Sequence, residues 1–561
     1  MSVGLPARHG ACVIPGAHTH RGGDPLRQLV RPTRLIAAAA LTVALGLGAV
    51  PSAQGGPTFD ETVRFLEQST FGPTLDLIAH VQQVGFEAFI DEQFALPAPI
   101  FPLLDNLPSS PSQGCKEICQ RDNYSMYLLQ RGSYAAFITS EHQLRLRMMV
   151  ALSQIFVVSA VNPSLRQPSR MLPYLSVLSN ASFGNFRQLL TEITLNPAMG
   201  RFLDTVNNHR ERPNENYARE LLQLLTIGVN LLNPDGTPVV DASGQPVPAY
   251  DQSTITAFAR VFTGWVFTAP EKEGVPNYNE PMVPGARNAH DRQPKTLLNG
   301  VTLPGDRDAP TDLRDALDNI FAHQNVGPFI SRRLIQHMVS SNPSPLYVQR
   351  VAAVFRATGG DMKSVIKAIL LDIEARTDPA TGPPGNPLSG YLREPILWTT
   401  SFLRMFGPLL VTDFVLADSF LPGGLVMGQD LYRPPSVFSF YPPDNVVAGD
   451  AILGPEFAIY STSTALARTN FAYQVIYKQM NTNDNRPVGT YIDLTSVASA
   501  GNDPVGLVDA LNHIFLGGRM SPEMRAVIIS STVALPASNP LARLRNALFL
   551  IVTSPQYLVQ R

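Results

Sequence analysis

Cysteine and charge are both scarce in this sequence. The chain of 561 residues has three cysteines, too few for a disulfide-rich scaffold or a four-thiolate zinc site. Charged residues make up 16% of the chain, against about 25% in a typical soluble domain. The net charge of -2 argues against a nucleic-acid-binding protein built on a basic face. Hydrophobic residues make up 44%, enough to bury a large core, which excludes wholesale disorder.

Several common catalytic motifs are also missing beyond residue 53. There is no G-x-S-x-G nucleophile elbow, no P-loop, no G-x-G-x-x-G and no H-E-x-x-H. These absences argue against a serine esterase, a nucleotide-binding enzyme and a zinc protease of the HExxH type. No later apolar run approaches the roughly 18 residues of a membrane-spanning helix, so the processed chain is expected to have no membrane span.

The first 53 residues contain the parts of a secretory signal peptide. Leu35–Val50 is an uncharged apolar run that follows three arginines, and small residues up to Ala53 come after it. The alternative to a cleaved signal peptide is a retained membrane anchor. The run is short for an anchor, which needs about 20 residues. We therefore predict a signal peptide with a long polar N-terminal extension at 1–53. The protein is expected to be periplasmic, extracellular or at the cell surface.

Two cysteines remain after this segment, in the order C-K-E-I-C. In an oxidising compartment Cys115 and Cys119 can close a very short loop. The alternative is two free thiols. We predict the disulfide.

The pattern of the remaining chain favours helices. Apolar residues recur at helical spacing, as after the capping residue Thr74, and Asp251 and Ser521 stand at further helix starts. With 49 prolines and 40 glycines, long irregular loops should separate the helices. We predict a mainly α protein, with one large helical domain over 54–561 and a small β-hairpin at about 233–250.

The densest polar stretch, 204–220, joins the end of one predicted helix to the next, which is expected over 213–229. Arginine can neutralise a carboxylate, histidine or tyrosine can abstract a proton, and glutamate can donate one. The structural alternative is a charged turn with a capped helix start, including an ion pair between Glu215 and Arg219. The candidate catalytic residues here are His209, Tyr217 and Glu220, and the candidate substrate contacts are Arg210, Asn214 and Arg219.

A long Pro/Gly/Asn-rich loop is expected over 269–312, and such loops are often functional. It contains the candidate catalytic pair His290 and Asp291, and the candidate anion contact Lys295. The alternative is a capping aspartate beside an exposed histidine. No metal site is predicted. The aromatic residues of P-S-V-F-S-F-Y-P-P can line a sugar-binding groove or belong to the core, and the sequence leaves both possibilities open.

Several long strings occur together and in order, and they resemble the domain of unknown function 1800 family of exported bacterial proteins. The resemblance spans about 59–561. The strings that carry it include F-L-E-Q-S-T-F-G-P-T (65–74), N-P-A-M-G-R-F-L-D (196–204), P-N-E-N-Y-A-R-E-L-L-Q-L-L-T-I-G (213–228), A-R-V-F-T-G-W (259–265) and P-S-V-F-S-F-Y-P-P (435–443).

The resemblance implies little about chemistry, because the family has no settled activity. Its genes often lie beside those of the exported unknown-function 1501 family, whose members resemble sulfatases, so a partner from that family is possible by association. Many relatives carry W-H-N-H where this chain has Leu152–Ile155, and a histidine near Leu225. A metal site built on those histidines is therefore not carried over.

Two classes of function fit these observations, and the sequence does not decide between them. The first is an enzyme that acts on an extracytoplasmic polymer, a polysaccharide, by acid/base hydrolysis or elimination, with no cofactor. The second is a non-catalytic envelope or cell-surface scaffold or binding protein; a small-molecule sensor or carrier ranks below both. An enzyme requires polar groups that converge in a cleft, whereas a scaffold should show a broad apolar patch.

Overall fold

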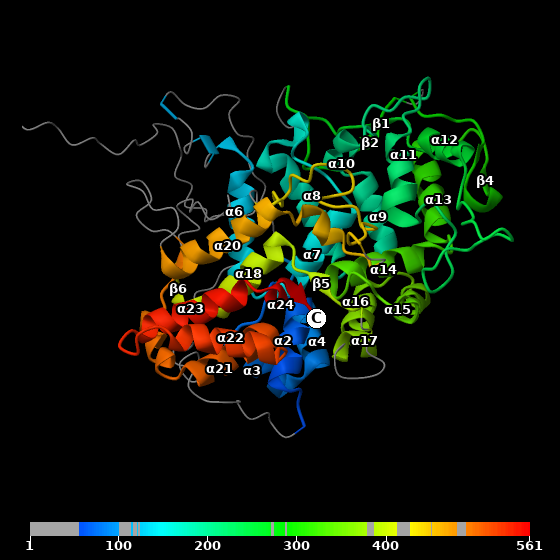
Figure 1. Ribbon diagram of the computed structural model, residues 1–561. Coiled ribbons are helices and arrows are strands. Elements are labelled where there is room, and N and C mark those ends of the chain that lie inside the picture. Colours follow the sequence, from blue (N-terminus) through cyan, green and yellow to red (C-terminus); the bar gives the residue numbers. More distant parts are fainter. Residues whose placement is uncertain are drawn as a thin grey trace, which may run out of the picture.

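The described part of the chain is mainly α-helical, as predicted (Figure 1). The computed structural model describes residues 55–99, 114–115, 120–121, 124–270, 274–286, 289–378, 386, 388–411, 427–449, 452–478 and 490–561. The predicted signal peptide lies outside these ranges and stays a prediction.

The helices follow one another along most of these segments. The first half of the chain contains α2 (Phe59–Ser69), α3 (Leu75–Val84), α4 (Phe86–Ala95), α6 (Tyr127–Thr139), α7 (Gln143–Ile155), α8 (Pro168–Ala181), α9 (Phe186–Thr194), α10 (Pro197–Phe202), α11 (Asn216–Glu220) and α12 (Gln252–Val261). The second half contains α13 (Ala309–Phe321), α14 (Val326–Met338), α15 (Pro345–Ala357), α16 (Met362–Leu370), α17 (Ile373–Arg376), α18 (Pro395–Met405), α20 (Thr462–Tyr477), α21 (Pro504–Leu516), α22 (Pro522–Val533), α23 (Pro540–Val552) and α24 (Pro555–Leu558). Short 3-10 helices are η2 (Pro163–Leu165), η4 (Leu298–Gly300), η5 (Gly407–Leu409), η6 (Pro455–Ile459) and η7 (Thr495–Asn502).

Side-chain caps determine where several helices begin. Thr58 forms a capping box with Glu61 at the start of α2. Thr74, Asp251 and Ser521 each accept a hydrogen bond from the backbone N–H three residues later. These side chains satisfy N–H groups that a helix start leaves without partners. The three helix starts predicted from the sequence are therefore confirmed.

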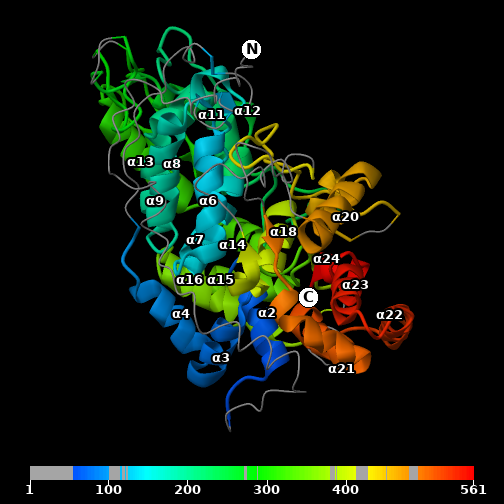
Figure 2. The same ribbon diagram turned by 90° about the vertical axis from the view of Figure 1, so that its left-hand side faces the viewer.

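The helices pack in two regions that share one buried apolar cluster, which extends from Val63 to Leu558. In Figure 2, α6, α8 and α9 run side by side, and α7 packs against both α8 and α14. In the other region, the C-terminal helices α21 to α23 lie beside α2, so the two ends of the described chain are neighbours (Figure 1). No helix within the described ranges is both long and apolar enough to cross a bilayer.

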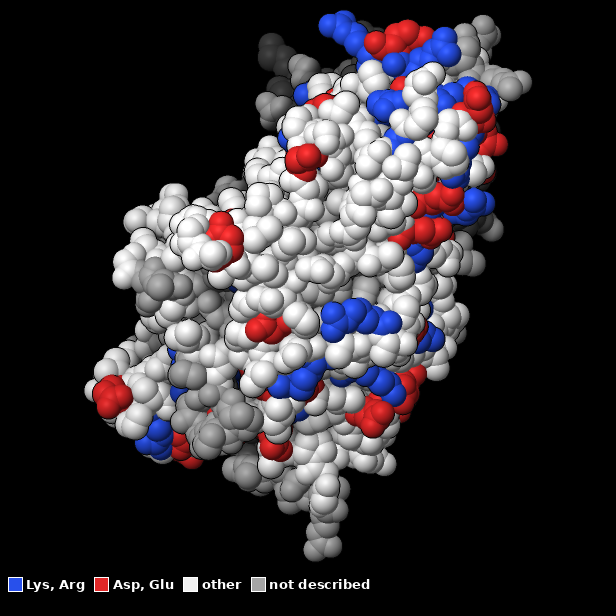
Figure 3. All heavy atoms as spheres, turned by 90° about the vertical axis from the view of Figure 1, so that its right-hand side faces the viewer, with Lys and Arg blue, Asp and Glu red and all other residues white. Residues whose placement is uncertain are grey.

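Charged side chains are unevenly distributed over the surface. Figure 3 shows the side of the molecule that carries α12 and α13, where acidic and basic groups gather at the top and along one edge. Around α13, Arg187 pairs with Asp318 at 2.7 Å, and Arg314 pairs with Asp315 at 2.9 Å. These neighbouring charges therefore largely neutralise one another.

The predicted hairpin forms as a set of isolated bridges rather than as continuous strands. Bridges join Asn230 to Pro248, Leu232 to Pro238 and Val240 to Pro246. Each bridge includes a proline, which has no N–H for a strand ladder. The segment therefore turns twice, as the sequence indicated, but it contains no regular strand.

Within the described segments, regular strands occur elsewhere, as four two-residue antiparallel pairs that the sequence pattern does not predict. They pair β1 (Trp265–Val266) with β2 (Val283–Pro284), β3 (Lys295–Thr296) with β4 (Thr302–Leu303), β5 (Tyr391–Leu392) with β8 (Val559–Gln560), and β6 (Leu410–Val411) with β7 (Tyr491–Ile492). The first two pairs tie down the loop expected over 269–312.

The helix expected over 213–229 changes its winding partway along. It is α-helical as α11 and continues as the π-helix η3 (Leu221–Thr226). A π turn contains an extra residue, and such turns are frequent at functional sites. Gly228, with φ of 74°, ends the element, as its predicted C-terminal position requires.

Candidate functional site

The loop that carries His290 is anchored in the core by a buried cluster of ions. The His290 ring lies with Nδ1 2.9 Å from the Thr263 carbonyl oxygen and Nε2 3.1 Å from the Asp312 carboxylate. Lys295, 1% exposed, donates to the same carboxylate at 2.7 Å. Burial works to raise the pKa of Asp312, but the hydrogen bonds from His290 and Lys295 outweigh it and hold that pKa below its ordinary value. His290 and Lys295 therefore have buried structural partners.

The neighbouring Asp291 forms an ion pair with Arg260. Its carboxylate accepts two hydrogen bonds from Arg260, at 2.9 and 3.0 Å. Burial opposes ionisation, but these hydrogen bonds keep the Asp291 pKa below its ordinary value. Gly264 allows the loop to approach, because a Cβ at this residue would lie 2.9 Å from the His290 backbone nitrogen.

The polar stretch at 204–220 does lie beside this loop. The backbone N–H of Arg210 donates to the carbonyl of Ala289 at 3.1 Å. The residues nearest this junction are exposed: His209, Asn214 and Arg210, whose guanidinium pairs with Glu211 at 2.9 Å. The two candidate segments are therefore neighbours on the surface.

Tyr217 points away from that surface into the core. Its side chain is 1% exposed, and its hydroxyl lies 2.7 Å from the hydroxyl of Thr194. The ring packs edge-on against Phe262, with 5.0 Å between ring centroids. Burial raises the pKa of Tyr217 above its ordinary value. These contacts are those of a core tyrosine.

Glu220 is half-buried and has no hydrogen-bond partner among the described residues. The predicted ion pair forms between Arg219 and Glu215, at 2.9 Å. Burial raises the pKa of Glu220, against the opposing charge of Arg219. The nearby Tyr250 hydroxyl is buried without a partner. Among the predicted catalytic residues, Glu220 is therefore a half-buried carboxyl group with a raised pKa and no hydrogen-bond partner among the described residues.

The pocket described below is not lined by any of the candidate residues from the 204–220 stretch or the His290 loop. The catalytic and substrate-binding roles proposed for these candidate residues stay predictions. Cys115 is buried and in a disulfide, whereas Cys119 lies outside the described residues, so the predicted pairing also stays a prediction.

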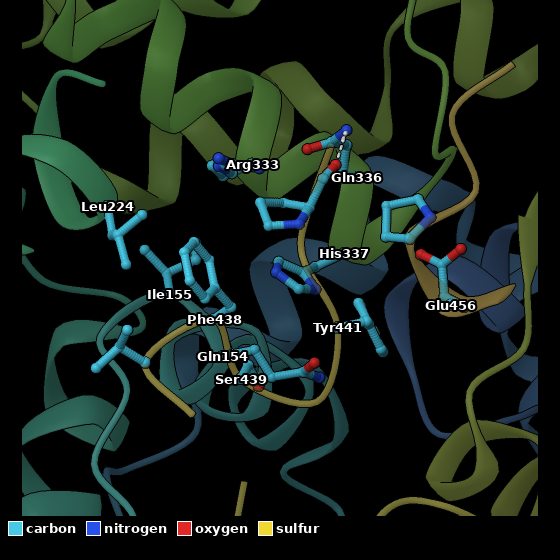
Figure 4. Close-up of a pocket in the computed structure, with 13 residues that line it drawn as sticks. Gln154, Ile155, Leu224, Arg333, Gln336, His337, Phe438, Ser439, Tyr441 and Glu456 are labelled. Carbon is cyan, nitrogen blue, oxygen red and sulfur yellow. Dashed lines mark hydrogen bonds between the residues drawn. The ribbon is translucent and has the colours of Figure 1, made fainter. Parts of the chain in front are cut away.

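A different part of the molecule contains a pocket lined by titratable groups. It lies where the end of α7, η3, α14, the loop at 437–443 and η6 meet, and it encloses about 40 Å³, room for about three water molecules. Figure 4 shows Ile155 and Phe438 on one side of it, Tyr441 and Glu456 on the other, and His337 between them.

Glu456 is the most strongly perturbed carboxyl group of this pocket. It is 2% exposed and accepts a hydrogen bond from the Ser341 hydroxyl at 3.0 Å. Burial, reinforced by the charge of Glu394, raises the pKa of Glu456 to about 8. Its carboxyl group therefore carries a proton at neutral pH and can donate it.

His337 contributes an uncharged imidazole. Burial, together with the charges of Arg147 and Arg333, lowers the pKa of His337 to about 3. Arg147 donates to the His337 carbonyl at 2.6 Å and so fixes this turn of α14. The ring is neutral at physiological pH and can donate or accept a hydrogen bond.

Tyr441 connects the pocket to a second carboxyl group. Its hydroxyl donates to Glu394 at 2.8 Å. Glu394 is fully buried at the start of α18 and also accepts from Gln154, at 3.1 and 3.0 Å, and from Gln429. Burial and the adjacent Glu394 raise the pKa of Tyr441 well above its ordinary value. A proton taken up by the Tyr441 oxygen can be balanced by passing the hydroxyl proton to Glu394.

Several polar atoms on the pocket wall lack partners. The side-chain amide oxygens of Gln154 and Gln336 and the hydroxyl of Ser439 are buried without a hydrogen bond. Ser439 also has φ of 64°, a left-handed conformation that costs a residue with a side chain about 1–3 kcal/mol. Buried groups of this kind are usually satisfied by water or ligand. Strain and unmet hydrogen bonding thus coincide at one wall.

Two features of the sequence pointed in part to this pocket. P-S-V-F-S-F-Y-P-P, whose role was open, supplies Val437 to Ser439, Tyr441 and Pro443 to the lining. Gln154 and Ile155 belong to the helical stretch where many relatives have histidines. No signal pointed to Glu394 and Glu456, since both are single acidic residues without a motif. No group of three or more His, Cys, Asp or Glu within the described segments is arranged to hold a metal ion.

The fold and this pocket define a mainly α-helical protein with a buried carboxyl group, a neutral imidazole and a guanidinium around one cavity. A family model described as "Protein of unknown function (DUF1800)" matches residues 64–559, so the chain belongs to this family. No curated protein and no solved structure matches the chain significantly.

Proposed function

We propose that this protein is an acid/base enzyme that acts on an extracytoplasmic polysaccharide at the pocket around Glu456. The observation that carries this proposal is the raised pKa of Glu456 in a cavity that Tyr441 also lines. Acid and base groups with pKa values moved apart by their surroundings are typical of active sites. Export, proposed from the N-terminal 53 residues, would bring the enzyme to such a polymer.

The two carboxyl groups take different roles in this proposal. Glu456 donates its proton to the oxygen of the bond that breaks. The Tyr441 oxygen accepts a proton while its own passes to Glu394, 2.8 Å away. The proton accepted comes from water in a hydrolysis, or from a sugar carbon in an elimination.

A hydroxyl-rich substrate fits the wall of the pocket. The unpartnered oxygens of Gln154 and Gln336 require donors, and sugar hydroxyls are donors. Phe438 is 42% exposed and lines the same pocket, so its ring is available to pack against a sugar face. Since the cavity holds only about 40 Å³, it accommodates one substituent of a sugar, with the rest of the polymer outside.

The proposal is tested by incubating the secreted full chain with a panel of neutral and acidic polysaccharides. Shortening of the polymer is followed by the appearance of reducing ends. We expect wild-type protein to cleave at least one polymer, and Glu456→Gln to lose at least about 100-fold in rate.

A matched control is Glu215→Gln, the same chemical change at a carboxylate that pairs with Arg219 away from this pocket. It should keep wild-type activity. If no polymer is cleaved, or if Glu456→Gln is as active as wild type, the enzyme proposal fails and the non-catalytic scaffold becomes the better account.

A further inference from the structure

Arg333 is a cation in the pocket wall without a counter-ion. It lines the pocket from α14, and it makes no hydrogen bond or ion pair with any described residue. Its guanidinium lies over the Phe329 ring, 5.1 Å from the centroid. Burial lowers the pKa of Arg333 to about 10, so it stays charged at neutral pH. The Arg333 side chain is only partly buried, so its guanidinium can pair with an anion that enters the pocket.

The charged groups near Arg333 do not provide it with a counter-ion. Arg147, whose charge also acts on His337, is fully buried, and its Nε and Nη1 atoms have no partner. None of the acidic groups pairs with Arg333: Glu456 is protonated at neutral pH, Glu394 is hydrogen-bonded to Tyr441 and Gln154, and the exposed Asp444 acts on Arg333 only from beyond ion-pair distance. The wall is therefore suited to an anionic group.

We propose that Arg333 binds the carboxylate of a uronic acid residue, so that the substrate is an acidic polysaccharide and the reaction is a β-elimination. This inference rests on the proposed function and specifies its substrate class. A planar guanidinium matches a carboxylate in a two-bond fork. The volume of about 40 Å³ suits a carboxylate rather than a whole sugar ring.

The elimination needs no co-reactant, and its atoms balance. A carboxylate held by Arg333 makes the hydrogen on the adjacent ring carbon, C5, more acidic. The Tyr441 oxygen takes that proton and passes its own to Glu394. The electron pair of the C–H bond forms a double bond between C4 and C5, the C4–O bond breaks, and the leaving oxygen takes the proton of Glu456. Glu394 then returns its proton through Tyr441 to solvent, and Glu456 takes up a proton from solvent, which restores the site.

Binding of a monosaccharide tests this inference without requiring turnover. Galacturonate and glucuronate are the probes, glucose is the neutral comparison, and binding to the secreted full chain is measured by saturation-transfer NMR or calorimetry. We expect a uronate to bind and glucose not to, with affinity reduced about tenfold or more in Arg333→Gln. Arg332→Gln, the adjacent arginine that does not line the pocket, should bind as wild type does.

The outcomes separate this inference from the proposed function. Glu456→Gln should still bind the uronate although its rate of polymer cleavage is greatly reduced. Equal binding of glucose and uronate, no uronate binding, or equal losses in Arg332→Gln and Arg333→Gln would overturn the inference. Cleavage of a neutral polymer with wild-type rate in Arg333→Gln would overturn it too, while the acid/base proposal would stand.

Discussion

The protonated state of Glu456 should be visible in the stability of the protein, with no substrate needed. The folded-state pKa is about 8, and the ordinary value is 4.5. Below 4.5 both the folded and the unfolded chain hold the proton. As the pH rises towards 8, the unfolded chain releases it first, so the free energy of unfolding falls.

The size of the effect follows from the two pKa values. A difference between 4.5 and about 8 corresponds to about 5 kcal/mol, lost as the pH rises through this window. Glu456→Gln has no proton to release, and its amide oxygen can still accept from Ser341. The variant should therefore equal wild type at about pH 5 and exceed it by several kcal/mol at about pH 9.

Chemical unfolding of wild type and Glu456→Gln across this range measures the difference directly. Other titrating groups affect both proteins equally and cancel in the comparison. Glu215→Gln is the control, because hydrogen bonds from Thr256 lower the pKa of Glu215, so its contribution does not change in this window. A difference between wild type and Glu456→Gln that is constant with pH would show that Glu456 ionises normally, and the reasoning would be refuted.

Four further predictions concern other parts of the chain. Asp312→Asn should lower the free energy of unfolding by about 3–5 kcal/mol at neutral pH, because Lys295 and His290 lose their buried charged partner. The difference from wild type should shrink at acidic pH, where wild-type Asp312, whose pKa is lowered, also loses its charge. Equal stability of the two proteins in unfolding experiments at neutral pH would contradict this. Glu220→Gln should leave the free energy of unfolding unchanged or slightly higher, since burial raises the pKa of this unpaired carboxyl, and a loss above about 1 kcal/mol would reveal a partner. Mass spectrometry of protein from the native cell should show a new N-terminus near residues 50–56, whereas an intact Met1 in a cytoplasmic fraction would end the export proposal. Alkylation of unreduced exported protein should find no free thiol at Cys115 and Cys119, and two labelled thiols would refute the bridge.

Local features of this chain were predictable from its sequence because their causes are local. Thr74, Asp251 and Ser521 cap helices through hydrogen bonds that span three residues. The ion pair between Glu215 and Arg219 likewise follows from a spacing of four on one helix. The family resemblance over about 59–561 is confirmed by the family match over residues 64–559.

The pocket depends on contacts that no local pattern contains. Gln154, Tyr441 and Glu394 meet from three distant segments. In contrast, the dense polar stretch at 204–220 drew attention by its composition, yet Tyr217 from it is a core residue. A run of polar residues in a sequence can be a solvent-exposed surface as well as an active site. A pKa that is shifted by burial can be recognised only once the chain is packed.

The hairpin and the π-helix show a third kind of limit. Turn residues placed the reversals near 233 and 241 correctly, but Pro238, Pro246 and Pro248 interrupt the ladder. The leucine-rich run after Glu220 predicts a helix, yet apolar spacing does not distinguish an α turn from a π turn. Leu224, within the π-helix, lines the pocket.

The pH dependence of kcat/KM on a cleaved polysaccharide tests the central claim most directly. If Glu456 is the general acid, wild-type kcat/KM should fall as the pH rises through about 8, where the carboxyl group loses its proton. The residual activity of Glu456→Gln should lack this step. A wild-type profile without a loss near pH 8, or the same loss in Glu456→Gln, would contradict the assignment of the chemistry to this pocket.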